Sequence, residues 1–128
     1  MILATLSSNM RTYSHTELVA WQRAMDLAVA IYGTSRVLPR DERYGLTTQM
    51  RRGAVSISAN IGEGQGRRTC GECLNCLSIA YGSLGERETH LMLAERLNFI
   101  EPDMVRGILE RTAEVGRLIN GLARSLKS

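Results

Sequence analysis

Three cysteines spaced three residues apart are the side chains of this sequence that could most readily do chemistry: Cys70, Cys73 and Cys76. On a helix they would fall within an arc of about 120°, which is close enough to share a metal ion. An iron–sulfur cluster would want a fourth thiolate, which the chain lacks, and a fourth zinc ligand could come only from His15, His90 or a carboxylate. Cys70 and Cys73 also fall on positions that a helix here would bury, where a reduced cysteine packs as a small apolar residue. We therefore interpret the cysteines as packing residues and expect no metal and no cofactor.

A glycine-rich segment is followed directly by two arginines. The pattern of Gly62, Gly64 and Gly66 follows a helix rather than a strand, and its spacing differs from that of a dinucleotide-binding loop. Arg67 and Arg68, however, immediately precede the expected start of a helix, where free backbone N–H groups attract anions. Gly66, Arg67 and Arg68 are therefore a candidate phosphate site. The alternative is a connector whose arginines are simply solvated.

Arginine supplies almost all of the positive charge. Fifteen of the 16 basic residues are arginine, the formal net charge is +3 and the pI is about 9.0. Because a planar guanidinium binds phosphate and carboxylate in a bidentate manner, this composition permits a nucleic-acid partner. Arg51 and Arg52, on the flank of an expected helix, are further candidates for nucleic-acid or anion binding. The competing interpretation is that the arginines merely reflect a GC-rich genome.

Glu88 is an unexpected carboxylate, because it falls on the apolar stripe of a long expected helix. A buried unpaired carboxylate is costly, so we expect Glu88 to pair with an arginine or to face a subunit boundary. We likewise expect the polar side chains of Asn60 and Glu63 to stabilise the structure. The sharper alternative is catalysis, but a di-iron bundle needs Glu-x-x-His pairs, and positions 12 and 87 are Thr and Arg. Two histidines do not make a Ser-His-Asp arrangement either, so we predict that the protein is not an enzyme.

Helical periodicity organises nearly the whole chain. Only two prolines, one Trp and one Phe occur, and apolar residues recur at i, i+3, i+4 and i+7 in four stretches. The expected helices span about residues 16–37, from about 42 to an end within the glycine-rich segment 62–66, 69–98 and 101–126.

The apolar stripes predict which positions face the interior. In the first helix these are Leu18, Trp21, Met25, Ala28, Ile31 and Tyr32, and in the third they are Cys70, Cys73, Leu74, Leu77, Tyr81, Leu84, Leu91 and Ala94. Ser14 with Glu17 resembles a capping box for the first helix, and Asp41 is the expected N-cap of the second.

Short connections between these helices require neighbours to run antiparallel. We therefore predict an all-α, antiparallel up-down four-helix bundle over residues 14–128, preceded by a flexible N-terminal arm over residues 1–13. No apolar run reaches the 18 or so residues of a membrane span, and no signal peptide is evident. The odd number of cysteines does not make a disulfide framework, so we expect a cytoplasmic protein with no membrane partner.

Five strings in the order and spacing found here resemble those of a known bacterial family. They are LVAWQRAMDL at 18–27, ERYGLTTQMRR at 42–52, VSISANIGEG at 55–64, AYGSLGERET at 80–89 and LINGL at 118–122. The chain is similar over about residues 16–126 to the four helix bundle protein family, also called the 23S rRNA intervening-sequence protein family. It departs from the usual pattern at Gly62, where most relatives have Ala, and at the three cysteines. No family role therefore extends to the cysteines, and Gly62 is expected to loosen the end of its helix.

The resemblance implies a cytosolic up-down bundle without established catalysis, assembled as a ring-like homo-oligomer of five copies. It also implies a distant similarity to the accessory variability protein of diversity-generating retroelements, a basic pentamer that engages nucleic acid. A pentamer of this chain would carry a formal charge of about +15, enough to attract RNA or DNA backbones without reading their sequence. We predict a nucleic-acid or ribonucleoprotein accessory protein. The alternative is a scaffold for another protein, because Val55 and Ile79 are apolar residues outside the stripes.

Overall fold

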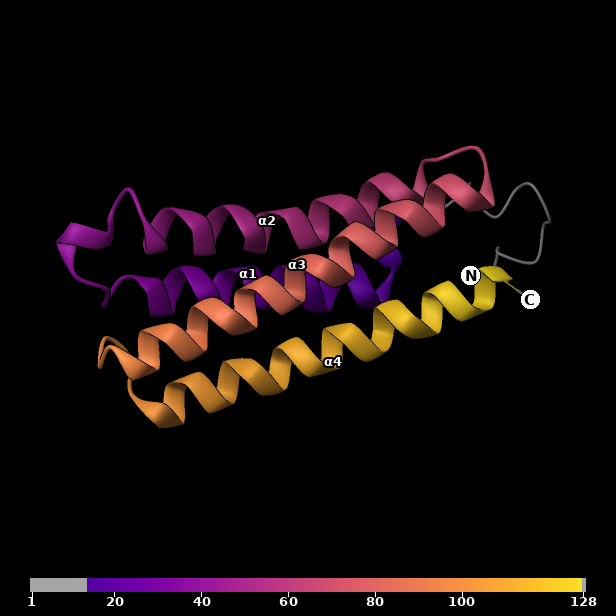
Figure 1. The fold of residues 1–128 in the computed structure, drawn as a ribbon. Helices are drawn as coiled ribbons and strands as arrows, with labels where there is room; N and C mark the ends of the chain where they lie inside the picture. The colour runs from indigo at the N-terminus through magenta and orange to yellow at the C-terminus, as the bar shows by residue number, and fades with distance from the viewer. Residues whose placement is uncertain (1–13, 128) are drawn as a thin grey trace.

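The computed structural model describes residues 14–127, in which every regular element is helical. The four α-helices are α1 (Val19–Ser35), α2 (Leu46–Gln65), α3 (Cys70–Arg96) and α4 (Pro102–Lys127), and two short 3₁₀ helices are η2 (His15–Glu17) and η3 (Arg40–Glu42). Consecutive helices run antiparallel and pack side by side, and α4 packs back against α1 (Figure 1). This arrangement confirms the predicted all-α, up-down four-helix bundle. The predicted arm, residues 1–13, lies outside the described residues.

The interior of the bundle is aliphatic, as the scarcity of aromatic residues requires. Its largest fully buried apolar side chains are Leu27, Ile31, Met50, Ile57, Ile61, Leu91, Val105, Val115 and Ile119. Complete burial of one such side chain contributes about 1.5–3 kcal/mol. Because all four helices supply members of this set, the helices hold one another together through one shared core.

The first two helices begin differently from the prediction. Ser14 does act as a cap, but its Oγ accepts a hydrogen bond from the Thr16 N–H and so caps η2, whereas the N-cap of α1 is Leu18. The predicted N-cap of α2, Asp41, is also wrong. The N-cap is Gly45, and the carboxylate of Glu42 accepts a hydrogen bond of 3.1 Å from the Leu46 N–H.

The other two turns follow recognised capping chemistry. Thr69 precedes α3, and its Oγ1 accepts a hydrogen bond of 3.1 Å from the Glu72 N–H. At the other end of α3, Asn98 adopts φ = 62°, a left-handed conformation that asparagine tolerates better than most residues. Pro102 opens α4 at a position where a missing N–H does no harm. These signals explain why the turns fall at these places.

The buried faces of α1 and α3 differ in part from the predicted stripes. In α1 the buried residues include Ala20, Ala24 and Leu27, whereas Met25 and Tyr32 are exposed. In α3 the predicted Cys70 and Tyr81 are exposed, and the buried positions are Cys73, Cys76, Leu77, Ala80, Ser83, Leu84, Arg87, Leu91 and Ala94. Small residues let the helices approach closely, so they occupy much of the true interface.

Candidate functional site

The Arg51 side chain is fixed between α1 and α2. Its Nε donates a hydrogen bond of 2.8 Å to Ser35 Oγ, and its guanidinium carbon lies 5.0 Å from the centre of the Tyr32 ring. Arg51 is half-buried, whereas its neighbour Arg52 is exposed. Because Ser35 and Tyr32 belong to the last turns of α1, these contacts place Arg51 at the end of the bundle where α1 passes into α2.

The connector between α1 and α2 adds three exposed arginines that the sequence interpretation did not single out: Arg36, Arg40 and Arg43. Tyr44 follows them and is 87% exposed, with the Arg43 guanidinium carbon 5.5 Å from its ring centre. The Thr48 hydroxyl donates a hydrogen bond to the Arg43 carbonyl oxygen and so ties the connector to α2.

We call this set of side chains the basic end; it consists of Tyr32, Arg36, Arg40, Arg43, Tyr44, Arg51 and Arg52. It lies opposite the end of the bundle that carries the described N- and C-terminal residues (Figure 1).

The basic end holds a charge equal to that of the whole chain. Residues 32–52 contain five arginines and two carboxylates, Asp41 and Glu42, for a net charge of +3. The formal net charge of the full chain is also +3, so the positive and negative charges of the remaining residues cancel. Within residues 14–127 none of the five arginines is within ion-pair distance of a carboxylate. A charge count along the sequence would have revealed this segment.

The predicted Gly66-Arg67-Arg68 site lies at the other end of α2. Gly66 lies 14 positions after Arg52, which corresponds to about 21 Å along a helix. The candidate arginines at 51–52 and those at 67–68 therefore do not form one site. Arg67 forms an ion pair with Glu63. The Cys76 side chain, as a hydrogen-bond partner, and then the Glu63 carboxylate raise the pKa of the Arg67 guanidinium. Anion binding by Gly66, Arg67 and the exposed Arg68 stays a prediction, although Glu63 competes for that charge.

The three cysteines are divided between surface and interior. Cys70 is exposed, and its Sγ lies 3.0 Å from the Leu126 carbonyl oxygen, whereas Cys73 and Cys76 are buried. A Cβ on Gly64 of α2 would lie 3.2 Å from Cys76 Cβ and 3.5 Å from Cys73 Sγ. Gly64 therefore allows α2 and α3 to approach closely over these two thiols. Among the described residues, no cluster of three potential metal ligands occurs.

The charged group buried in α3 is Arg87, not Glu88. Arg87 is 4% exposed, and its guanidinium lies directly over Gly53 of α2, in the space that a side chain there would fill. Glu88 is half-buried on the α4 side of α3 and forms no ion pair with any described residue. Of its two predicted roles, a position at a subunit boundary stays a prediction. The missing side chain of Gly53 makes room for Arg87, which a hydropathy pattern on α3 alone does not reveal.

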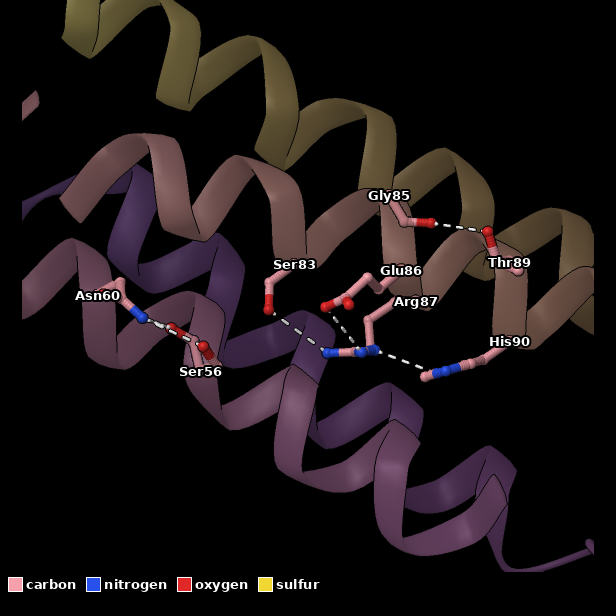
Figure 2. A network of polar contacts seen from close by, with 8 residues as sticks. All are labelled: Ser56, Asn60, Ser83, Gly85, Glu86, Arg87, Thr89 and His90. Carbon is pink, nitrogen blue, oxygen red and sulfur yellow. Dashed lines mark hydrogen bonds and ion pairs between the residues drawn. The ribbon is translucent and has the colours of Figure 1, made fainter. Parts of the chain in front are cut away.

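Arg87 is the centre of a small polar network at the α2–α3 contact (Figure 2). Its Nε lies 3.3 Å from His90 Nδ1, Nη1 lies 3.5 Å from Ser83 Oγ and Nη2 lies 3.5 Å from Glu86 Oε1. Burial lowers the pKa of Arg87, an effect that Glu86 opposes. Burial, and then the positive charge of Arg87, also lower the pKa of His90. His90 is therefore a neutral acceptor for the guanidinium.

The remaining predicted polar residues have local partners. The Asn60 side-chain amide donates to the Ser56 carbonyl oxygen at 2.9 Å and to Ser56 Oγ at 3.1 Å, one turn earlier in α2 (Figure 2). Glu63 pairs with Arg67 as described above. The end of α2 at Gln65 falls within the predicted glycine-rich segment 62–66, and the absence of a side chain at Gly62 leaves room for the His15 ring.

A second surface feature is a groove of about 310 Å³ between α3 and α4. Its lining residues are Tyr81, Leu84, Gly85, Glu88, Thr112, Ala113, Gly116, Arg117 and Asn120. Gly85 in this lining, and Gly82 next to Tyr81, have nothing near their missing side chains. Glycine in a helix interior destabilises the helix by about 1 kcal/mol relative to alanine. Val55 and Ile79 are 47% and 49% exposed, so these two apolar residues do lie off the buried faces.

None of the helices in residues 14–127 combines the length and apolar character of a membrane span. A family model described as 23S rRNA-intervening sequence protein matches residues 16–121, most of the chain. No curated protein matches this chain. Among solved structures, the chain resembles a protein of unknown function from the S23 ribosomal protein family of Bacteroides thetaiotaomicron VPI-5482. The two are 24% identical with a TM-score of 0.76, over 82% of this chain and 98% of that one, which supports the same fold.

Proposed function

Because the chain belongs to the 23S rRNA-intervening sequence protein family, we propose that it is a non-enzymatic accessory protein that binds RNA through the basic end. The ligand in this proposal is the phosphate backbone of RNA, free or in a ribonucleoprotein. We also propose a cytoplasmic location, which suits three free thiols.

The observation that carries this proposal is the concentration of charge at the basic end. Five arginines that form no ion pair within residues 14–127 lie on one connector and the adjoining turns of α1 and α2, while the charges of the remaining residues cancel. Guanidinium groups bind phosphate oxygens bidentately, and Arg51 is already oriented by Ser35 and Tyr32. The five arginines outnumber the two carboxylates of this segment, Asp41 and Glu42, so the segment attracts a polyanion.

The proposal predicts a strong dependence on salt. If all five arginines contact phosphates of a single strand, log K falls with log salt concentration with a slope of about −3.5. Raising the salt from 50 to 200 mM then weakens binding about 100-fold, and removing two of the contacts reduces that factor to about 20.

The test is a binding titration with fluorescently labelled RNA at those two salt concentrations. The double variant Arg40→Gln/Arg43→Gln should bind more weakly and with a shallower salt dependence. The matched control, Arg111→Gln/Arg117→Gln on α4, removes the same charge from exposed residues elsewhere and should bind nearly as wild type. Equal losses in the two variants, or no binding by wild type at 50 mM salt, would refute the proposal.

We further propose that several copies assemble, with the ring-like homopentamer as the expected form. Exposed apolar side chains such as Val55 and Ile79 support an interface between bundles. Five copies would present five basic ends to one polyanion, which strengthens binding through multivalency. Light scattering of the purified protein measures the subunit number directly, and a monomer at micromolar concentration would contradict assembly.

The second candidate is a scaffold whose partner is another protein. The groove between α3 and α4 favours it, because exposed Tyr81, the half-buried Glu88 and two glycine positions offer a shaped surface away from the basic end. A variant that fills the groove, Gly85→Leu, should abolish partner binding but leave RNA binding unchanged. Loss of RNA binding in that variant would argue against two separate surfaces.

A further inference from the structure

Two tyrosines at the basic end are exposed beside arginines. Tyr44 is 87% exposed and Tyr32 is 39% exposed. Neither ring belongs to the buried core, and neither hydroxyl forms a hydrogen bond with a residue of the described range. Each ring instead lies beside a guanidinium, Arg43 at 5.5 Å and Arg51 at 5.0 Å. Each pair therefore combines an exposed aromatic ring with a positive charge.

We propose that Tyr44 and Tyr32 are stacking platforms for unpaired bases, so that the basic end takes a single-stranded segment, a loop or an end in preference to continuous duplex. This inference rests on the proposed function, because the arginines must first hold the backbone. The ligand class is an unpaired nucleotide segment of RNA, whose bases stack on the rings while its phosphates contact the neighbouring guanidinium groups.

Base stacking on aromatic side chains and on guanidinium planes is a recurring means of holding single strands. In duplex RNA the bases are stacked inside the helix and the major groove is too deep and narrow for a side chain to reach them. The two tyrosines can therefore add affinity for unpaired bases only. The arginines, in contrast, contact phosphates of either form.

The arrangement around Tyr32 is organised before any ligand binds. Ser35 Oγ accepts a hydrogen bond of 2.8 Å from Arg51 Nε, and this holds the guanidinium beside the ring. Tyr44 lies on the connector, whose carbonyl at Arg43 is bound by the Thr48 hydroxyl. Less conformational entropy is then lost when a nucleotide binds, which favours affinity from a few contacts.

The experiment is fluorescence anisotropy with the full-length protein and three labelled ligands of 16 nucleotides per strand: an unstructured RNA, an RNA duplex and a single-stranded DNA of the same sequence. Wild type is compared with Tyr44→Ala and with Tyr44→Phe, which keeps the ring. Because Tyr44 is almost fully exposed, neither variant should affect folding, and circular dichroism verifies this.

Wild type should bind the single-stranded RNA at least about fivefold more tightly than the duplex, the lower limit for one stacked base. Tyr44→Ala, which leaves Tyr32 in place, should reduce this preference and leave duplex affinity within about twofold, whereas Tyr44→Phe should retain the full preference. Single-stranded DNA that binds as well as RNA supports stacking without sugar recognition. DNA that binds more weakly than RNA but more tightly than duplex supports stacking together with contacts to the 2′-hydroxyl.

The inference is overturned if wild type binds single strand and duplex equally, or if Tyr44→Ala weakens both equally. Either result leaves the proposed function intact, provided that Arg40→Gln/Arg43→Gln weakens binding more than its control does. Failure of wild type to bind any of the three ligands at 50 mM salt would instead refute the proposed function, and the two failures are thereby distinguished.

Discussion

Gly53 and Arg87 should be energetically coupled, because one residue occupies the space that the other lacks. A methyl group on Gly53 would coincide with the Arg87 guanidinium, so Gly53→Ala must expel that group from its place between α2 and α3. Expulsion breaks three long hydrogen bonds, to Ser83, Glu86 and His90. At the low end of the usual range, about 0.5 kcal/mol each, their loss destabilises the fold by about 1.5 kcal/mol.

A gain in helix propensity opposes that loss. Alanine stabilises a helix interior by about 0.5–1 kcal/mol relative to glycine, so Gly53→Ala alone should lower the free energy of unfolding by about 0.5–1 kcal/mol. In an Arg87→Ala background there is no guanidinium to expel, and the same change should raise the free energy of unfolding by about 0.5–1 kcal/mol. The coupling between the two positions is then about 1.5 kcal/mol.

The assay is urea denaturation of the four proteins of the cycle, followed by circular dichroism at one fixed protein concentration. Gly107→Ala, at an exposed α4 glycine with nothing near its missing Cβ, is the control and should have the same effect in both Arg87 backgrounds. If Gly53→Ala changed stability equally in both backgrounds, within about 0.5 kcal/mol, the described burial of Arg87 over Gly53 would be refuted.

Two further predictions concern α3. Gly82→Ala should stabilise the protein by about 0.5–1 kcal/mol in thermal or urea unfolding, because nothing lies near its missing Cβ; a destabilisation would show that Gly82 packs against another copy. Because burial and Arg87 lower the pKa of His90 in the folded protein, the unfolded chain takes up that proton first as the pH falls below about 6.5. The free energy of unfolding should therefore decline as the pH falls below about 6.5. His90→Gln should flatten this decline, and a decline unchanged by His90→Gln would contradict the assignment.

The fold was predictable because each helix carries its own periodic signal and the first three helices also carry a stop signal. Pro39 follows the end of α1, glycines accompany the end of α2 and Asn98 follows the end of α3. The residues facing the core were less predictable. Ala20 and Ala24 on α1 are buried, whereas the larger Met25 and Tyr32 were expected to be. The close approach of two helices favours small side chains over large apolar ones.

The polar sites show a different limit of sequence reasoning. Glu88 was placed on the buried stripe, but the buried charge is Arg87, because a glycine on another helix makes space for it. Nothing within α3 reports that pairing. Of the arginines at the basic end, the sequence interpretation identified only Arg51 and Arg52, although a charge count over residues 32–52 would have shown the local excess. The contact of Arg51 with Ser35 and Tyr32 required the packing of α1 on α2.

The most direct test of the account is to locate where RNA contacts the protein. Zero-length photo-crosslinking of a 4-thiouridine RNA at 50 mM salt, followed by mass spectrometry, identifies the contacted peptides. The account predicts that the crosslinked peptides lie within residues 32–52 and that Tyr44 is among the modified positions. Crosslinks confined to the turn at Gly66, Arg67 and Arg68, or to the α3–α4 groove, would contradict it.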